Sequence, residues 1–299
     1  MWAWGLNSSG QLGLANTTNY SSPKQVGSNT WKVIAGGDAF TIGITTSGAL
    51  FSWGTQSQGQ LGLNTTSGTY NSPKQIGALT TWLTVSSGQY MTQALKTDGT
   101  LWFWGDGRFY GQSGLGFLGS VSSPIMVGGV NTWKSVSVNY FHVAAIQTNG
   151  TLWTWGFGGF GEGGRGVTGN TSSPQQVGSL TNWAQVASGR DHIIAVKTDG
   201  TLWSFGYGYG GVLGLGNTTS YSSPKQVGAL TTWKAVAASS NGYNSYATTG
   251  TALYAWGNNG NSVLGIGNAT SYSSPKQVGS ATQWIGVSAG PNSAAGIHI

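Results

Sequence analysis

Apolar and polar residues alternate along short segments of this chain with a period of two. The clearest case is residues 151–156, TLWTWG, in which Trp153 and Trp155 stand two positions apart. Residues two apart lie on the same face of a β-strand, so this spacing predicts a strand with one aromatic face. No segment of useful length carries apolar residues at the 3.6-residue spacing of a helix. We therefore expect an all-β protein.

The same segments recur at a fixed interval. One series of tryptophans is spaced by 51, 51, 50, 50 and 51 residues: Trp31, Trp82, Trp133, Trp183, Trp233 and Trp284. A series of prolines, each after a serine, follows the same interval: Pro23, Pro73, Pro124, Pro174, Pro224 and Pro275. A period of about 50 residues is typical of propellers and solenoids. The sequence therefore predicts one domain, residues 1–299, made of six repeats.

Each repeat is expected to contribute four short strands, named a to d in chain order. Strand a is the T-L-W-x-W-G segment. Strand b is P-K-Q-V-G, with proline at its first position, where a missing N–H is tolerated. Strand c is W-K-x-V-A-x-G, and strand d leads through a T-D-G-T turn into the next strand a. Four strands in each of six repeats predict a six-bladed β-propeller.

The two ends of the chain carry complementary parts of a repeat. Residues 284–299 supply strands c and d, and the chain opens on a strand a, MWAWG. Aligned on the other repeats, Ile299 takes the place of Thr97 and Met1 that of Leu101, so only a d–a turn is missing between them. We expect the N-terminal strand to pair with the C-terminal strand and close the ring, which removes exposed sheet edges.

Several sequence motifs recur along the chain, namely G-Q-L-G-L, S-P-K-Q-V-G, W-K-x-V-A and K-T-D-G-T-L-W-x-W-G. In these segments the chain resembles the regulator-of-chromosome-condensation (RCC1-type) repeat family over essentially its whole length. The resemblance implies a β-propeller. Members of that family include a seven-bladed nucleotide-exchange factor and a seven-bladed β-lactamase inhibitor, whereas this chain has six repeats. The family's G-x-x-H-T pattern in strand d is kept here only around His192.

Composition narrows the classes of function. Only 6% of residues are charged, yet the 15 tryptophans argue against disorder. The net charge of +6 is scattered and forms no basic block, so we expect no nucleic-acid partner. The absence of cysteine excludes disulfides, thiolate metal sites and cysteine nucleophiles. With no long apolar run and no basic–apolar leader, we expect neither membrane insertion nor a signal peptide in this chain.

Glycine-rich segments follow strand a and imitate a dinucleotide-binding motif. Residues 156–161, GFGGFG, read G-x-G-x-x-G, and residues 206–211 repeat that pattern. A dinucleotide loop opens a helix, whose N-terminus binds the pyrophosphate. The chain continues here as V-T-G-N-T-S-S-P, which has no helical spacing. We interpret these glycines as turn residues with positive φ, and we expect no cofactor.

The titratable residues form no recognisable catalytic or metal-binding constellation. The three histidines, His142, His192 and His298, lack metal-ligand spacing, and we interpret them as isolated structural residues. Asp191 and His192 suggest part of a triad, but no G-x-S-x-G elbow supplies a nucleophile. Asp106 and Glu162 are the other acidic candidates. We therefore expect a non-enzymatic protein without a bound metal.

The repeats differ from one another mainly in two loops, a–b and c–d. If successive strands alternate in direction, both loops lie at the same face of the sheets. Aromatic and charged residues there are typical of binding surfaces. The alternative is that these rings fold down over a central channel. The candidate partner-binding residues are Asp106, Arg108, Phe109, Tyr110, Phe157, Phe160, Glu162, Arg165, Arg190, Asp191, His192, Tyr207, Tyr209 and Tyr243.

The sequence supports two classes of function. The first is a structural or binding module of a microbial or phage surface or virion, which engages a protein or glycan through these loops. Low charge and a surface rich in Ser, Thr, Asn and Gly motivate this hypothesis and an extracellular, cell-surface or virion location. The second, implied by the resemblance, is a regulatory propeller such as an exchange factor or an enzyme inhibitor.

Overall fold

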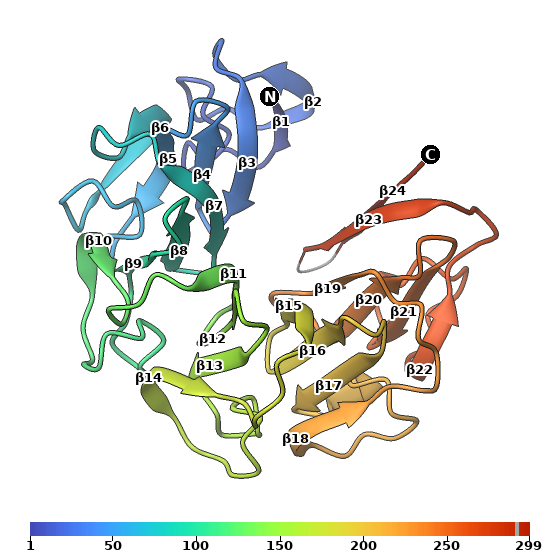
Figure 1. The fold of residues 1–299 in the computed structure, drawn as a ribbon. Helices are drawn as coiled ribbons and strands as arrows, with labels where there is room; N and C mark the ends of the chain where they lie inside the picture. The colour runs from blue at the N-terminus through green and yellow to red at the C-terminus, as the bar shows by residue number, and fades with distance from the viewer. Residues whose placement is uncertain (291–292) are drawn as a thin grey trace. The chain divides into compact units, whose positions relative to one another are not determined.

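The computed structural model describes residues 1–290 and 293–299. It divides the chain into two compact units, Met1–Val138 and Asn139–Ile299, where the sequence predicts one domain. Both units consist of short antiparallel strands (Figure 1).

The first unit contains eleven strands. They are β1 (Trp2–Gly5), β2 (Tyr20–Gln25), β3 (Trp31–Gly36), β4 (Phe40–Thr45), β5 (Leu50–Gln56), β6 (Gly68–Gln75), β7 (Trp82–Ser87), β8 (Met91–Lys96), β9 (Leu101–Gly105), β10 (Val121–Met126) and β11 (Trp133–Val138).

The described part of the second unit contains thirteen strands and one short 3-10 helix. They are β12 (His142–Gln147), β13 (Leu152–Gly156), β14 (Thr171–Gln176), β15 (Trp183–Ser188), β16 (His192–Lys197), β17 (Leu202–Gly206), η1 (Tyr209–Gly211), β18 (Tyr221–Gln226), β19 (Ala235–Ala238), β20 (Asn244–Thr248), β21 (Leu253–Gly257), β22 (Tyr272–Gln277), β23 (Trp284–Ala289) and β24 (Ala294–His298).

The strands of a complete sheet follow the order c, d, a, b. In the sheet β15-β16-β17-β18, for example, Trp183 of strand c faces Lys197 of strand d, and Ile194 of strand d faces Ser204 of strand a. The sheets β3–β6, β7–β10 and β19–β22 repeat this order. The alternating apolar pattern and the T-D-G turns therefore produce the four-stranded antiparallel unit that the sequence predicts.

The number of sheets differs from the predicted six blades. The described strands form seven sheets, five with four strands and two with two. One short sheet, β1–β2, consists of a strand a and a strand b. The other, β23–β24, consists of a strand c and a strand d. In each of these two sheets the paired strands are neighbours in the sequence. Neither sheet therefore contains the predicted pairing of β1 with β24. Closure by that pairing stays a prediction.

Strand b begins earlier than the sequence suggests. The prediction places its proline at the first position, but β18 starts at Tyr221 and has Pro224 in its interior. The register of β17 with β18 shifts between the pairs Ser204↔Lys225 and Gly206↔Tyr221, so a bulge spans the proline. Strand b also lies at the edge of its sheet. A bulge at an edge tolerates a residue without an N–H, which explains the error.

The hydrophobic core lies between consecutive sheets. The strand d of one sheet, β16, is buried along its whole length, so its alternating side chains face both neighbouring sheets. Ile193 and Ala195 pack in one cluster with Ile146 and Leu152 of the preceding sheet. The adjacent residues Ile194 and Val196 pack in another cluster with Trp233 and Trp256 of the following sheet. Period-two alternation on one strand thereby joins three successive sheets.

The glycine-rich segments after strand a are turns, as predicted. Gly161 has φ of 99°, and a Cβ there would lie 2.7 Å from the Cα of Ser222. An L-residue rarely adopts this φ, and a side chain would collide with the neighbouring backbone. After Gly156 the chain enters a loop and not a helix, so the dinucleotide interpretation fails for the reason given by the sequence.

Candidate functional site

The a–b and c–d loops of the second unit meet in a group of five aromatic residues, called here the aromatic cluster. Its members are Phe157, Phe160, Tyr207, Tyr209 and Tyr243. The rings of Phe160 and Tyr207 stack with centroids 4.4 Å apart, and Tyr209 and Tyr243 meet edge to face at 5.0 Å. Phe160 and Tyr209 keep 43% and 50% of their surfaces exposed. The cluster thus combines fixed ring geometry with exposed apolar surface.

A charged pair flanks the aromatic cluster. The Arg190 Nε lies 3.6 Å from Asp191 Oδ2, and its guanidinium lies 5.2 Å from the centre of the Tyr243 ring. The Tyr243 hydroxyl donates a hydrogen bond of 3.1 Å to Asp191 Oδ2. Burial raises the pKa of Asp191, while the Tyr243 hydrogen bond and the Arg190 charge oppose that rise. Arg190 therefore presents a neutralised, partly exposed guanidinium beside the rings.

Glu162 supports the cluster from beneath the surface. Its side chain is buried, and Glu162 Oε2 accepts a 2.9 Å hydrogen bond from the Phe160 N–H. Three other a–b loops have glutamine at this position, and Gln112 Oε1 likewise accepts from the Tyr110 N–H at 3.0 Å. Glu162 Oε1 has no hydrogen-bond partner in the described structure. Burial, with a smaller contribution from Asp191, raises the pKa of Glu162 to about 7.

A polar pocket of about 170 Å³ adjoins the charged pair. Arg190 and Tyr243 line one part of it, and Asn244 and Asn258 line another. The Asn244 side-chain amide donates to the Asn258 carbonyl at 3.4 Å, which ties the two loops together. The pocket therefore offers amide groups and a guanidinium next to the exposed rings, an arrangement suited to hydrogen-bonding a polar group of a partner.

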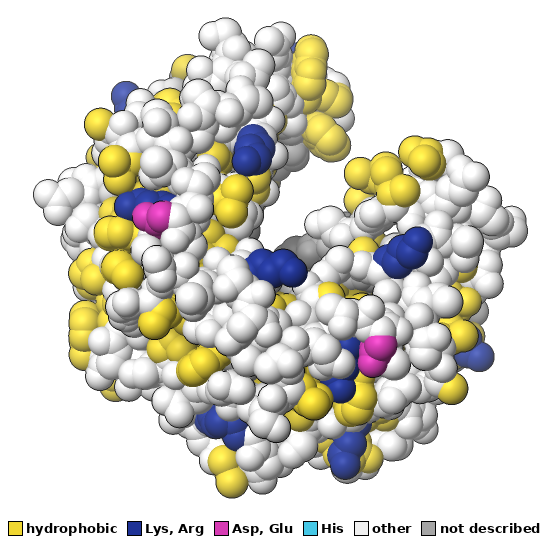
Figure 2. Space-filling view, viewed as in Figure 1, with side chains coloured by type: hydrophobic (Ala, Val, Ile, Leu, Met, Phe, Trp, Pro, Cys, Tyr) yellow, Lys and Arg dark blue, Asp and Glu magenta, His cyan; other side chains and the backbone are white. Residues whose placement is uncertain are grey.

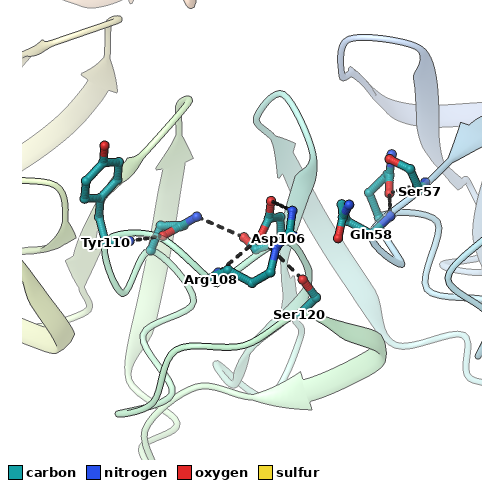
Figure 3. Close-up of polar contacts among 8 residues, drawn as sticks. Ser57, Gln58, Asp106, Arg108, Tyr110 and Ser120 are labelled. Carbon is teal, nitrogen blue, oxygen red and sulfur yellow. Dashed lines mark hydrogen bonds and ion pairs between the residues drawn. The ribbon is translucent and has the colours of Figure 1, made fainter.

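The candidates of the first unit form a separate, self-contained loop (Figure 3). The Arg108 guanidinium donates two hydrogen bonds of 3.0 Å to the carboxylate of Asp106, which also accepts from the Arg108 N–H. Ser120 Oγ donates to the same carboxylate at 3.4 Å. This bidentate ion pair neutralises the charge of Arg108 within the loop. Phe109 remains 56% exposed at its tip.

Three predicted contact residues are buried, which argues against direct contact with a partner. Asp106 and Glu162 support the loops just described. His192 is buried completely, and its Nε2 lies 2.9 Å from Ser245 Oγ. Ser245 Oγ in turn donates to the Val212 carbonyl at 3.0 Å. Asp191 points its carboxylate at Tyr243 instead, so Asp191 and His192 do not assemble the triad geometry.

The predicted isolation of the histidines is wrong for two of them. His142 and His192 are both buried, and burial lowers the pKa of His142 to about 4. Burial and, to a smaller extent, the nearby His142 lower the pKa of His192 to about 3. Neither ring is solvent-accessible. Each ring fills space in the interior, as Phe40 does at the equivalent position.

The surface carries no extended band of one charge in the view of Figure 2. Lys and Arg side chains appear singly among uncharged ones, and few acidic groups are visible. No described helix has the length and apolar character needed to span a membrane.

Sequence reasoning missed one loop of the site and the supporting role of one candidate residue. The loop containing Asn258 holds none of the candidate residues, although it lines the polar pocket. Its signal, two consecutive asparagines after a strand a, is weak. The replacement of glutamine by Glu162 was visible in the aligned G-Q-L-G-L segments and identifies a support residue.

The comparisons with known proteins agree on the fold. The family model for the RCC1-like domain matches residues 1–295. The E3 ubiquitin-protein ligase HERC2 of mouse and of human is 28% identical over 167 residues, 53% of this chain. The chain spans only 3% of the length of these curated relatives.

Two solved structures are similar over 99% of the chain. Human WBSCR16 has a TM-score of 0.86 and 23% identity, with 80% of its own chain covered. Yeast RCC1 (Prp20), solved with Kap60 bound, has a TM-score of 0.80 and 19% identity, with 76% covered. At these identities the similarity shows the fold alone.

Proposed function

Because the chain belongs to the RCC1-like domain family, we propose that it is a non-catalytic regulatory propeller that binds a protein partner through the aromatic cluster. The supporting observation is the meeting of two kinds of variable loop in one exposed group of rings beside Arg190. Aromatic residues and arginine dominate the energetics of protein interfaces. A channel cap would not leave Phe160 and Tyr209 half exposed.

The names of the relatives favour this regulatory hypothesis over a surface or virion module. One Prp20p structure carries a title that refers to binding of Gsp1p and histones, and another contains bound Kap60. These are protein partners of that yeast protein. The titles of the WBSCR16 and Prp20 structures name neither a glycan nor an extracellular location, so we develop the regulatory hypothesis.

Alanine at Phe160 and Tyr209 is expected to weaken partner binding at least tenfold, because two exposed rings of a hot spot would be removed. A photocrosslinking residue in place of Tyr209 would first identify the partner in cells of the source organism. Calorimetry with the purified partner then compares the wild type with Phe160→Ala/Tyr209→Ala.

Leu230→Ala is the matched control, since Leu230 is also 46% exposed but lies in the connection between strands b and c. Unchanged affinity of the double variant would refute the proposed surface. A parallel nucleotide-release assay with a small GTPase tests whether the regulation is exchange. Release without dependence on the cluster would assign the activity to another surface.

We also propose that β1 and β24 pair to complete a sixth blade. The Val26 N–H donates to the Met1 carbonyl as the Val227 N–H does to Leu202, so Met1 occupies the position of Leu202. Trp284 faces His298 as Trp183 faces Lys197. The register Ile194↔Ser204 then predicts that Ala295 faces Ala3.

A disulfide tests this pairing directly, because the protein has no native cysteine. Ala3→Cys/Ala295→Cys is expected to form an intramolecular bond on mild oxidation, since facing residues of antiparallel strands bring their Cβ atoms within about 5.5 Å. Ala3→Cys/Ala294→Cys is the control, because the neighbouring residue projects to the opposite face. Non-reducing electrophoresis and mass measurement distinguish the products. Only intermolecular bonds, or equal yields, would exclude this closure.

A further inference from the structure

A pocket of about 270 Å³ lies in the second unit, apart from the residues that line the polar pocket. Its walls are mainly apolar. The residues that line it include Arg165, Val177, Leu180, Trp183, Trp203 and Pro224. Val177 and Trp183 belong to the core cluster between sheets, with Trp203 packed against it. The pocket therefore opens where that core reaches the a–b loop.

The a–b loop that borders this pocket differs at two core positions from the a–b loops of the other repeats, called here the sister loops. Leu61 and Leu63 in the first unit, and Leu213 and Leu215 in the second, form an L-x-L segment whose members are buried or packed against a core cluster. The equivalent segment here is Gly163-Gly164-Arg165. No residue of that segment takes part in the core cluster beside the pocket. Gly163, which has no side chain, and the cation Arg165 thus replace two apolar side chains.

Glycine at position 163 makes room for the guanidinium. A Cβ on Gly163 would lie 2.9 Å from Arg165 Nη2 and 3.1 Å from Nη1. The two replacements are therefore coupled, since a leucine at 163 would displace the arginine from its present conformation. An arginine in place of a packed leucine breaks the pattern of the fold, and such departures are expected at functional sites.

In the part of the chain that the structure describes, the Arg165 charge has no anionic partner. Within residues 1–290 and 293–299, the ion pairs are Arg108–Asp106 and Arg190–Asp191. The recorded contact of Arg165 is a 3.3 Å hydrogen bond from Nη1 to the neutral Thr154 Oγ1. Burial lowers the pKa of Arg165, and no acidic group counteracts it. A partly buried guanidinium without a carboxylate favours binding of an anion.

From the apolar walls and the unpaired charge together, we propose that this pocket binds an apolar group that carries a carboxylate. Trp183, Trp203 and Leu180 would contact the apolar group, and Arg165 would bind the carboxylate through two N–H groups. The volume lies just below the usual range of ligand pockets and suits one aromatic or branched side chain. The chemistry is shared by a short fatty acid and by the C-terminal residue of a peptide.

Calorimetric titration tests the proposal with N-acetyl-phenylalanine, its neutral amide and octanoate. The carboxylate is expected to bind roughly 10- to 100-fold more tightly than the amide, because the amide loses the charge-assisted pair. Stronger binding of octanoate would indicate a fatty acid, and stronger binding of N-acetyl-phenylalanine a peptide terminus. Equal affinity for acid and amide, or no binding of any probe at millimolar concentration, would overturn the proposal.

Arg165→Leu is the matched variant, because it restores the residue of the sister loops. It is expected to lose binding of the acid by the same factor and to raise the unfolding midpoint by roughly 2–4 °C. Lys234→Met removes an exposed charge from the same unit and should leave affinity unchanged. Unchanged affinity of Arg165→Leu would refute the site. Phe160→Ala/Tyr209→Ala should bind the acid normally, so the outcome is independent of the proposed partner surface.

Discussion

Replacing Glu162 with glutamine is expected to stabilise the protein by up to about 3 kcal/mol above pH 7 and to have little effect below pH 4.5. Burial raises the pKa of Glu162 from 4.5 to about 7 in the folded protein. Between these values the folded state keeps its proton while the unfolded state releases it, so stability falls as pH rises. Glutamine removes that dependence.

The sister loops explain why glutamine fits. Gln112 accepts from the Tyr110 N–H and its Nε2 donates to the Asp106 carbonyl at 3.2 Å. Protonated Glu162 can imitate this with one O–H, whereas the carboxylate cannot donate at all. Chemical denaturation at pH 4.5 and pH 8 measures the effect.

The reciprocal variant, Gln112→Glu, should introduce the same pH dependence in the first unit. If Glu162→Gln instead destabilises the protein equally at both pH values, the carboxyl group makes a contact that this explanation omits.

The second large effect concerns acid sensitivity and His192. The folded-state pKa values of His142 and His192 are lowered to about 4 and about 3 from 6.5. As pH falls below 6.5, the unfolded state takes up protons that the folded state does not, and stability falls. Between pH 6.5 and 4.5 each buried histidine costs about 2 kcal/mol.

His192→Phe is expected to make stability nearly independent of pH in this range. The remaining loss from His142 is offset by the gain from Glu162, whose contribution has the opposite sign. Phenylalanine suits the site, because Phe40 has the equivalent position and packs over Gly37 as His192 packs over Gly189. Unfolding midpoints across this pH range measure the slope.

His298→Phe makes the same substitution at an exposed position and serves as the control. It should leave the slope unchanged. An acid slope in His192→Phe equal to that of the wild type would show that other groups cause acid unfolding.

Much of the architecture follows from the sequence alone. The aromatic pairs, the 50-residue period and the T-D-G turns specify antiparallel four-stranded sheets, because period-two alternation and turn chemistry act locally. The same local information fails at Pro224, since the register shift that accommodates a proline inside strand b depends on the neighbouring strand.

The loops likewise separate what the sequence specifies from what packing decides. Their unusual composition marked Phe160, Tyr209 and Arg165 as candidates, because the repeats supply an internal standard. Their roles depend on packing. Phe160 and Tyr209 are exposed members of one cluster, whereas Arg165 lines a different pocket.

The sequence by itself determined the strand pattern, the repeat and the family, since each repeats along the chain. Only the tertiary structure decided which variable side chains are exposed and which are buried. Glu162 and His192 looked like surface groups in a variable loop, yet both lie in the interior. Burial depends on side chains from neighbouring sheets some 50 residues away, such as Ser245 against His192. No local pattern records those contacts.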